Sequence, residues 1–513
     1  MSTSTPHTSV VRRRVPHTLL QMSALASFLS EVDGAPQAAS SSSSSSSTST
    51  SSGPQGGLGK LVIACCIDWD GMGGRAGVNE ELAMDGPHVV EVPGCEQVRE
   101  VYSSSTSHHM FILGEAGELF AWGQNTDGAC GQGGGTIHWP LRISLPSSSM
   151  VVRKMATGRH HSLLLLTDGR LFATGSNASG QLGLGALAKG AKNVDKFTHV
   201  SSIELPCSDV SCGESHSMAC TSLESGGQLY TWGHPLNGQL GTGTKGDFIK
   251  DGGKGAAVQF HFVPTPFAVN KYVNKDAHGK VIGELVGAQV RIRQVGGGKN
   301  HSMVLEDWEN GGLGRLFSCG FGGYGRLGHN GVGDELLFRE ISFFSMTARD
   351  PATGVLSPVA PTNPQRKIVK IDAGNSLSVA VSVIGTAWNW GKLSNSKSGE
   401  SIVYPKLCDA GGGLIADPRL LANGSNLVVV GFGPDIVAWG VPVAGKLGLD
   451  GDVRSSVVPK YVSALEGIPV HAVCAGHGHV GFVCCPTKAQ KLPEYKKPGG
   501  ADDASKAKKQ KTK

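Results

Sequence analysis

Short apolar runs separated by glycine-containing turns recur along the chain between about residues 58 and 485. A complete unit begins with an apolar run after His161-Ser162, turns at Asp168-Gly169, and continues as a second run to Gly175. Asp-Gly between two apolar runs is a strong signal for a β-hairpin. The string Gly180-Gln181-Leu182-Gly183 follows, and its glycines supply backbone angles that residues with a Cβ avoid. The pattern therefore predicts a repeated strand–turn–strand unit that ends in a tight reversal.

Six copies of this unit follow one another, although the final reversal is degraded in the first copy and lost in the fifth. Each copy has a Gly that closes its second strand, and a His starts the first strand in the first four copies. We assign Leu377 and Asn426 to the His position in copies five and six. Because a residue that recurs at the same place in four units is set by packing, we interpret the His as a hydrogen-bonding group within or between blades and not as a catalyst. The four are His109, His161, His216 and His301.

Two half-units remain at the ends of this region. The run Gly59–Ile63 resembles the second strand of a unit, and Cys474–Phe482 resembles the first. The simplest account is that they combine into one composite seventh unit. This predicts an all-β fold, a seven-bladed β-propeller over residues 58–485 that is closed by pairing of N- and C-terminal segments. Closure removes exposed sheet edges, which otherwise favour aggregation.

Composition changes at both ends of the chain. Residues 1–57 hold a Ser/Thr run with few large apolar side chains, which predicts a disordered tail. Arg12-Arg13-Arg14 and the absence of acids before Glu31 leave an organellar transit peptide open as an alternative. Residues 486–513 carry nine Lys against three acids and predict a Lys-rich tail. This tail is either a solubilising segment or a contact to a nuclear import receptor or a phosphate backbone, with Lys508, Lys509 and Lys511 as candidates.

Two insertions, 243–289 and 330–367, lengthen the chain after the third and fourth units and contain several Phe. Loops this long in a compact domain are usually functional or disordered, and the aromatic residues argue against full disorder. Two interpretations stay open, extra packing at a blade edge and a partner-binding surface. The charged candidates for partner binding are Lys271, Lys275, Asp334 and Glu335.

Motifs for catalysis and cofactor binding are missing from the sequence. The 12 Cys are scattered without a Cys-x-x-Cys pair, so no zinc site is predicted. The string Gly320–Gly325 fits a loose Gly-x-Gly-x-x-Gly but does not lie between a strand and a helix, as a dinucleotide site requires. No segment is long and apolar enough for a membrane span. We predict a monomeric, non-enzymatic display scaffold without cofactor, metal or membrane contact.

The repeat units resemble those of the regulator of chromosome condensation family, whose signature is a strand, Trp-Gly and then Gly-Gln-Leu-Gly. Trp232-Gly233 followed by Gly238–Gly241 is one full copy, and the resemblance covers about residues 58–495. It implies a seven-bladed propeller that regulates a small GTPase of the Rac, Ral or Ran kind in mitosis and cytoskeletal organisation. Guanine nucleotide exchange is among the activities ascribed to the family. The implied location is nucleus and cytoplasm, with chromosome or spindle association in mitosis. The alternative is a chromatin- or microtubule-associated scaffold without a GTPase role, bound through the basic tail.

Overall fold

A computed structural model shows how the repeat region folds. It describes residues 57–70, 84, 86–185, 190–249, 258–260, 262–276, 278–309, 312–349, 356–359, 363–393, 401–408, 415–441 and 455–496. The predicted N-terminal tail lies outside the described residues except for Gly57, and so do residues 497–513 of the predicted Lys-rich tail.

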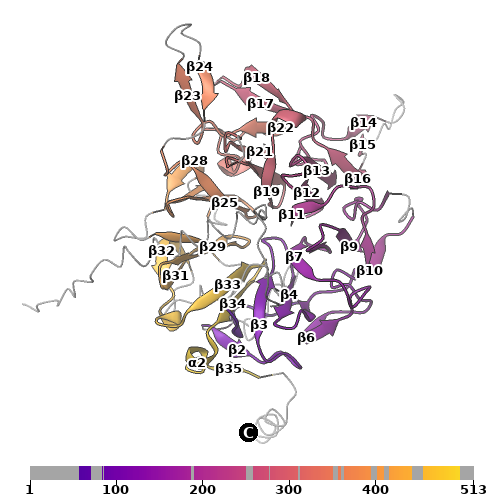
Figure 1. The fold of residues 1–513 in the computed structure, drawn as a ribbon, viewed down its shortest axis with the longest axis vertical. Helices are drawn as coiled ribbons and strands as arrows, with labels where there is room; N and C mark the ends of the chain where they lie inside the picture. The colour runs from indigo at the N-terminus through magenta and orange to yellow at the C-terminus, as the bar shows by residue number, and fades with distance from the viewer. Residues whose placement is uncertain are drawn as a thin grey trace, which may run out of the picture. The chain divides into compact units, whose positions relative to one another are not determined.

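The described residues form seven blades around one axis (Figure 1). The first two blades contain β3 (Val98–Tyr102), β4 (His109–Gly114), β5 (Leu119–Gly123), β6 (Ile137–Ile143), and then β7 (Val152–Thr157), β8 (His161–Leu166), β9 (Leu171–Ser176), β10 (Asn193–His199). The third and fourth contain β11 (Cys207–Cys212), β12 (His216–Thr221), β13 (Leu229–Gly233), β16 (Val263–Ala268), and then β19 (Ile292–Gly297), β20 (His301–Glu306), β21 (Leu316–Gly320), β22 (Glu335–Glu340). The fifth and sixth contain β25 (Ile368–Ala373), β26 (Leu377–Ser382), β27 (Ala387–Gly391), β28 (Ile402–Leu407), and then β29 (Ala416–Asn423), β30 (Leu427–Phe432), β31 (Asp435–Gly440), β32 (Ser456–Tyr461). The prediction of an all-β, seven-bladed propeller is confirmed.

The seventh blade takes strands from distant parts of the chain. Its order is β33 (Val470–Ala475), β34 (His479–Cys484), β1 (Lys60–Cys65), β2 (His88–Val90) and β35 (Glu494–Tyr495). Strand β1 pairs antiparallel with β34, with Lys60 opposite Cys484 and Cys65 opposite His479. Beyond β34 the chain forms the short helix α2 (Pro486–Ala489) before β35, which pairs parallel with β2. The first residues of the predicted Lys-rich tail are therefore part of this blade.

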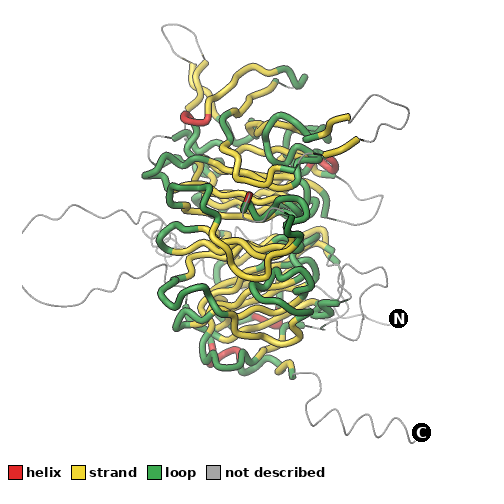
Figure 2. Tube along the Cα trace, turned by 90° about the vertical axis from the view of Figure 1, so that its right-hand side faces the viewer, coloured by secondary structure: helices red, strands yellow, loops and turns green. Residues whose placement is uncertain are grey.

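The first strand of each blade is the inner strand. Neighbouring inner strands contact one another all the way round, including β33 with β3. Each inner strand is bulged, which bends it locally. In Figure 2, at 90° to the first view, strands cross the middle of the ring and loops gather on its two faces. Those loop-rich faces are where the repeat can present varied side chains to a partner.

The core lies between adjacent blades. Trp122, Trp232, Trp390 and Trp439 are fully buried, and each comes from the third strand of its blade. The tight reversal of the preceding blade packs on this indole where the repeat is intact. At Gly328, for example, φ is 77° and an added Cβ would lie 2.9 Å from Nε1 of Trp390. The Gly-x-Leu-Gly string is thus required by backbone angle and by close packing.

The fourth blade is widened by the first insertion. Strand β17 (Lys271–Lys275) pairs parallel with β22, and β18 (Val281–Val286) pairs antiparallel with β17, which makes a six-stranded sheet. This part of the insertion is extra packing at a blade edge. Two separate hairpins, β14 (Asp247–Ile249) with β15 (Val258–Phe260) and β23 (Met346–Arg349) with β24 (Leu356–Val359), lie within the two insertions.

The assignment of Asn426 to the repeated His position is wrong by one residue. Leu427 lies opposite Gly440, as His161 lies opposite Gly175. Asn426 instead precedes the strand, and its carbonyl accepts a hydrogen bond from the N–H of Val441. Two adjacent residues cannot be told apart by spacing alone when the preceding loop lacks its usual sequence, and strand pairing decides between them.

Candidate interaction surface

Histidines in five blades hydrogen-bond to the next blade. In each case Nε2 lies 2.7–3.0 Å from a serine Oγ. Each serine donates its own proton to a backbone carbonyl, as Ser217 does to Gln181 at 2.7 Å, so the imidazole Nε2–H is the donor to the serine. The predicted structural role of the repeated His is confirmed. The pairs are His109–Ser162, His161–Ser217, His216–Ser302, His301–Ser378 and His479–Ser103.

Burial keeps these imidazoles neutral. It lowers the pKa of His161, His216 and His479 to about 3, and neighbouring histidines add to the effect. Burial also holds the pKa of His109 and that of His301 well below the usual value. A neutral, hydrogen-bonded imidazole without access to substrate has no role in proton transfer, so this belt of residues is structural.

The loops that precede the histidines bond to one another along the ring. The N–H of Arg159 donates to the carbonyl of Glu214 at 3.3 Å, and the N–H of Glu214 donates to that of Lys299 at 3.4 Å. Side chains reinforce this contact, since Arg159 pairs with Glu214 at 2.9 Å and Lys299 approaches the same carboxylate at 3.8 Å. The charges of these loops are thus largely satisfied by their neighbours.

An exposed aromatic side chain with two buried cations beside it lies on the fourth blade, in the loop between β21 and β22. Tyr324 is 45% exposed and has a φ of 65°, a conformation that costs a non-glycine residue free energy. The guanidinium of Arg326 lies 5.6 Å from the Tyr324 ring centroid, and Nζ of Lys392 lies 4.7 Å from it. Both cations are otherwise buried, and burial lowers the pKa of Arg326 to about 10. An exposed aromatic ring that contacts two cations is suited to bind a partner.

Three of the predicted partner-binding residues meet beside this loop. Lys275 of β17 pairs with Glu335 of β22 at 2.5 Å, and Arg339 pairs with the same carboxylate at 2.8 Å. Asp334 pairs with Lys245 at 2.9 Å and also accepts the N–H of Gly322 at 3.0 Å. Lys275 and Glu335 therefore attach the inserted hairpin to the blade, while the exposed Asp334 stays at the surface.

The remaining candidates are separate from this group. Lys271 lies at the other end of β17 and pairs with Glu284 of β18 at 2.8 Å. Lys508, Lys509 and Lys511 lie outside the described residues. We define the blade-four surface as Lys245, Tyr324 and Asp334, and Lys392 of the fifth blade lies buried beside the Tyr324 ring. Sequence reasoning missed Tyr324 and Lys392, although an aromatic residue in a turn that has Ser179 and Asn237 in other copies was a usable signal.

Other kinds of site are not found in the described ranges. No group of three or more His, Cys, Asp or Glu side chains there could hold a metal ion. All 12 cysteines are described and none is in a disulfide. Among the helices that the structure describes, none combines the length and apolar character that a membrane crossing needs.

Comparison with known proteins agrees with the repeat. The sequence profile of the regulator of chromosome condensation (RCC1) repeat matches residues 116–165, 168–220 and 314–381, and a second profile of that description matches 152–181. Human Protein RCC2 is 31% identical over 453 residues, which cover 85% of this chain and 79% of the relative. The chain belongs to the regulator of chromosome condensation family. The Xenopus laevis Protein RCC2 homolog is 30% identical, with 85% and 81% covered.

Solved structures of the same fold are more distant in sequence. Human WBSCR16 superposes with a TM-score of 0.60 at 17% identity and covers 83% of this chain and 99% of its own. Prp20p from Saccharomyces cerevisiae, described with its binding properties to Gsp1p and histones, has a TM-score of 0.58 at 17% identity, with 88% and 95% covered. At this identity the likeness supports the propeller fold alone.

Proposed function

We propose that this chain is a non-catalytic propeller scaffold that binds and regulates a small GTPase. The observation that carries the proposal is family membership over most of the chain, at 31% identity to human Protein RCC2. Prp20p, which shares the fold, is described with binding to Gsp1p. A partner of the Rac, Ral or Ran kind, guanine nucleotide exchange, and action in mitosis on chromosomes or the spindle are the finer parts of the same proposal.

The blade-four surface is the contact that we propose for this partner. Interfaces are enriched in Tyr and Arg at their centres. Tyr324 is exposed, and the buried guanidinium of Arg326 contacts its ring. Arg326 donates to the carbonyls of Gly323 at 2.9 Å and Asn375 at 2.5 Å, which fixes the aromatic loop to the fifth blade. A preformed aromatic anchor lowers the entropy cost of binding.

The test is binding of purified Ran, Rac and Ral, each nucleotide-free and loaded with GDP or a GTP analogue, to the full chain. Tyr324→Ala should weaken binding at least about tenfold, as expected for a central aromatic contact. Tyr461→Ala is the matched control, because Tyr461 is 48% exposed but lies on β32 of the sixth blade. Release of labelled GDP from the bound GTPase measures exchange. Retention of no GTPase at micromolar protein would contradict the proposal.

A chromatin- or microtubule-bound scaffold is the second candidate function. The observation in its favour is the Lys-rich segment 486–513, with nine Lys against three acids, and Prp20p is also described with histone binding. Removing residues 497–513 leaves β35 in place and should abolish binding to nucleosomes or microtubules. Affinity of the intact chain should fall steeply with salt, because phosphate or carboxylate contacts release counterions. Salt-independent binding would exclude this role.

A further inference from the structure

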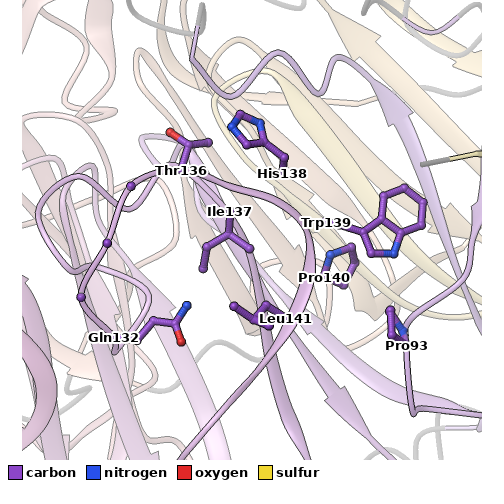
Figure 3. A pocket seen from close by; sticks show the side chains of 11 residues that line it. Pro93, Gln132, Thr136, Ile137, His138, Trp139, Pro140 and Leu141 are labelled. Atoms are coloured by element: carbon purple, nitrogen blue, oxygen red, sulfur yellow. The ribbon is translucent and has the colours of Figure 1, made fainter. Parts of the chain in front are cut away.

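An open hollow of about 500 Å³ lies on the first blade, along its outer strand β6 (Figure 3). Its lining combines two prolines, an aromatic ring and an exposed aliphatic side chain with three consecutive glycines at 133–135. In Figure 3, Trp139, Pro140 and Pro93 lie on one side and Thr136 lies on the other. A Cβ added at Gly134 or Gly135 would meet no atom within 4 Å, so the glycine segment leaves space for an incoming chain.

Trp139 is held rigidly at this hollow. Its ring stacks on Tyr495 at a centroid distance of 6.0 Å and an angle of 20°, and packs against Trp122 at 6.0 Å. Its indole N–H donates to no acceptor among the residues that the structure describes. Because an indole N–H only donates, a ligand that lies beside this group is favoured if it offers a carbonyl oxygen.

A carboxylate is fixed at the rim of the same hollow. Asp70 is 63% exposed, and its Oδ1 accepts a hydrogen bond from Oγ1 of Thr136 at 2.6 Å. His138 Nε2 lies 3.7 Å from the other oxygen. Thr136 and His138 both line the hollow, so the carboxylate is placed where it can meet a cation on a bound segment.

One ligand chemistry matches all three features. A polyproline II helix has no internal hydrogen bonds, so its carbonyls are free to accept from an indole N–H. Grooves lined by aromatic side chains recognise such segments, because the ligand is already extended and loses little entropy on binding. An exposed carboxylate selects for a basic residue in the segment by charge complementarity. We propose that the hollow binds a proline-rich segment of a partner protein that carries an Arg or Lys beside its prolines.

The test uses synthetic peptides and the full chain, with affinity measured by isothermal titration calorimetry. The probes are a proline-rich decapeptide with one Arg, the same peptide with Glu in place of Arg, and a proline-free peptide of equal charge. We expect the Arg peptide to bind with a dissociation constant below about 1 mM. The Glu peptide should bind about two- to fivefold more weakly, as expected for loss of one exposed ion pair.

Variants connect this binding to the hollow. Leu141→Arg changes a side chain that is 47% exposed and should weaken binding at least about tenfold, because it puts a cation opposite a basic ligand. Asp70→Asn should remove the preference for the Arg peptide over the Glu peptide. Trp139→Phe keeps an aromatic ring but removes the indole N–H, and it should weaken binding. Leu205→Arg, at a residue that is 45% exposed before β11, is the control and should bind as the unaltered chain does.

Four results would overturn the proposal. They are no binding of the Arg peptide at millimolar concentration, equal binding of the proline-free peptide, unchanged affinity in Leu141→Arg, and an unchanged Arg preference in Asp70→Asn. Circular dichroism and thermal unfolding of each variant establish that a loss of binding reflects the hollow and not the fold.

Discussion

The inter-blade histidine and its serine are replaced together where the hydrogen bond is absent. Leu377 of the fifth blade stands at the His position, and Val428 of the sixth stands at the Ser position, in one apolar cluster. Between the sixth and seventh blades, Leu427 likewise stands at the His position and Val480 at the Ser position, again in one apolar cluster. The double variant His216→Leu with Ser302→Val therefore introduces a pair that this ring already contains. We predict that it is less stable than the unaltered chain at neutral pH and more stable in acid.

The magnitude follows from the pKa of His216, which burial lowers from 6.5 to about 3. The unfolded chain binds a proton at this histidine more tightly than the native ring does. The histidine therefore has no pH-dependent cost to the free energy of unfolding above pH 6.5, and that free energy decreases as pH falls below 6.5. One pKa unit corresponds to about 1.4 kcal/mol, so at pH 5.0 this histidine costs the native state about 2 kcal/mol. At pH 7.5 the double variant loses about 1 kcal/mol, because the carbonyl of Gln239 no longer receives the Ser302 hydroxyl. The sign of the difference should therefore reverse between the two pH values.

The assay is urea unfolding of both proteins at pH 7.5 and 5.0, followed by tryptophan fluorescence. His278→Gln, at an exposed residue between β17 and β18, controls for the loss of a histidine as such. The reasoning would be refuted if the double variant and the unaltered chain differed in free energy of unfolding by the same amount at both pH values. It would mean that His216 is not held neutral by burial in the native ring.

Three further predictions concern stability and reactivity. Gly328→Ala should lower the free energy of unfolding by about 1–3 kcal/mol, from its positive φ and its contact with Trp390; thermal unfolding should show a larger loss than for Gly94→Ala, which has only the positive φ. Lys275→Ala removes one of two cations from the buried Glu335 and should raise amide hydrogen exchange in residues 271–286; exposed Lys271→Ala should change it little. Cys485 should react first with iodoacetamide in the native protein, detected by mass spectrometry. A hydrogen bond from Thr487 lowers its pKa, whereas burial raises the pKa of Cys65 to about 12.

The sequence was sufficient for the fold because the repeat encodes it locally. The Gly-x-Leu-Gly strings at 180–183 and 325–328 each pack on the Trp of the next blade, and the six recurring units together with the two half-units at the ends give seven blades. The insertion at 243–289 could not be interpreted in this way. Its strand β17 joins the fourth blade by parallel pairing with β22, more than 60 residues further along the chain. Pairing between distant segments leaves no local periodicity in either of them.

The candidate surface was only partly predictable for a related reason. The sequence offers Lys275 and Glu335 as partner-binding candidates on separate insertions, and the structure pairs them with each other at 2.5 Å. A sequence does not show whether a charge faces a partner or another charge of the same chain. Tyr324, in contrast, could have been found by comparing equivalent positions between copies, since the second and third copies have small polar residues there.

That comparison also explains how the fourth blade comes to present an aromatic side chain. In the second and third blades the glutamine of the reversal accepts the N–H of the residue two positions earlier, as Gln181 does from Ser179 at 2.8 Å. Arg326 occupies the glutamine position in the fourth blade and has no acceptor to offer. Its guanidinium instead donates to the carbonyls of Gly323 and Asn375, and Tyr324 takes a φ of 65°. One exchange of an acceptor for a donor thus rebuilds the turn, fixes it to the next blade and exposes the ring. A departure from the repeat at a packing position therefore creates a surface feature that the intact copies lack.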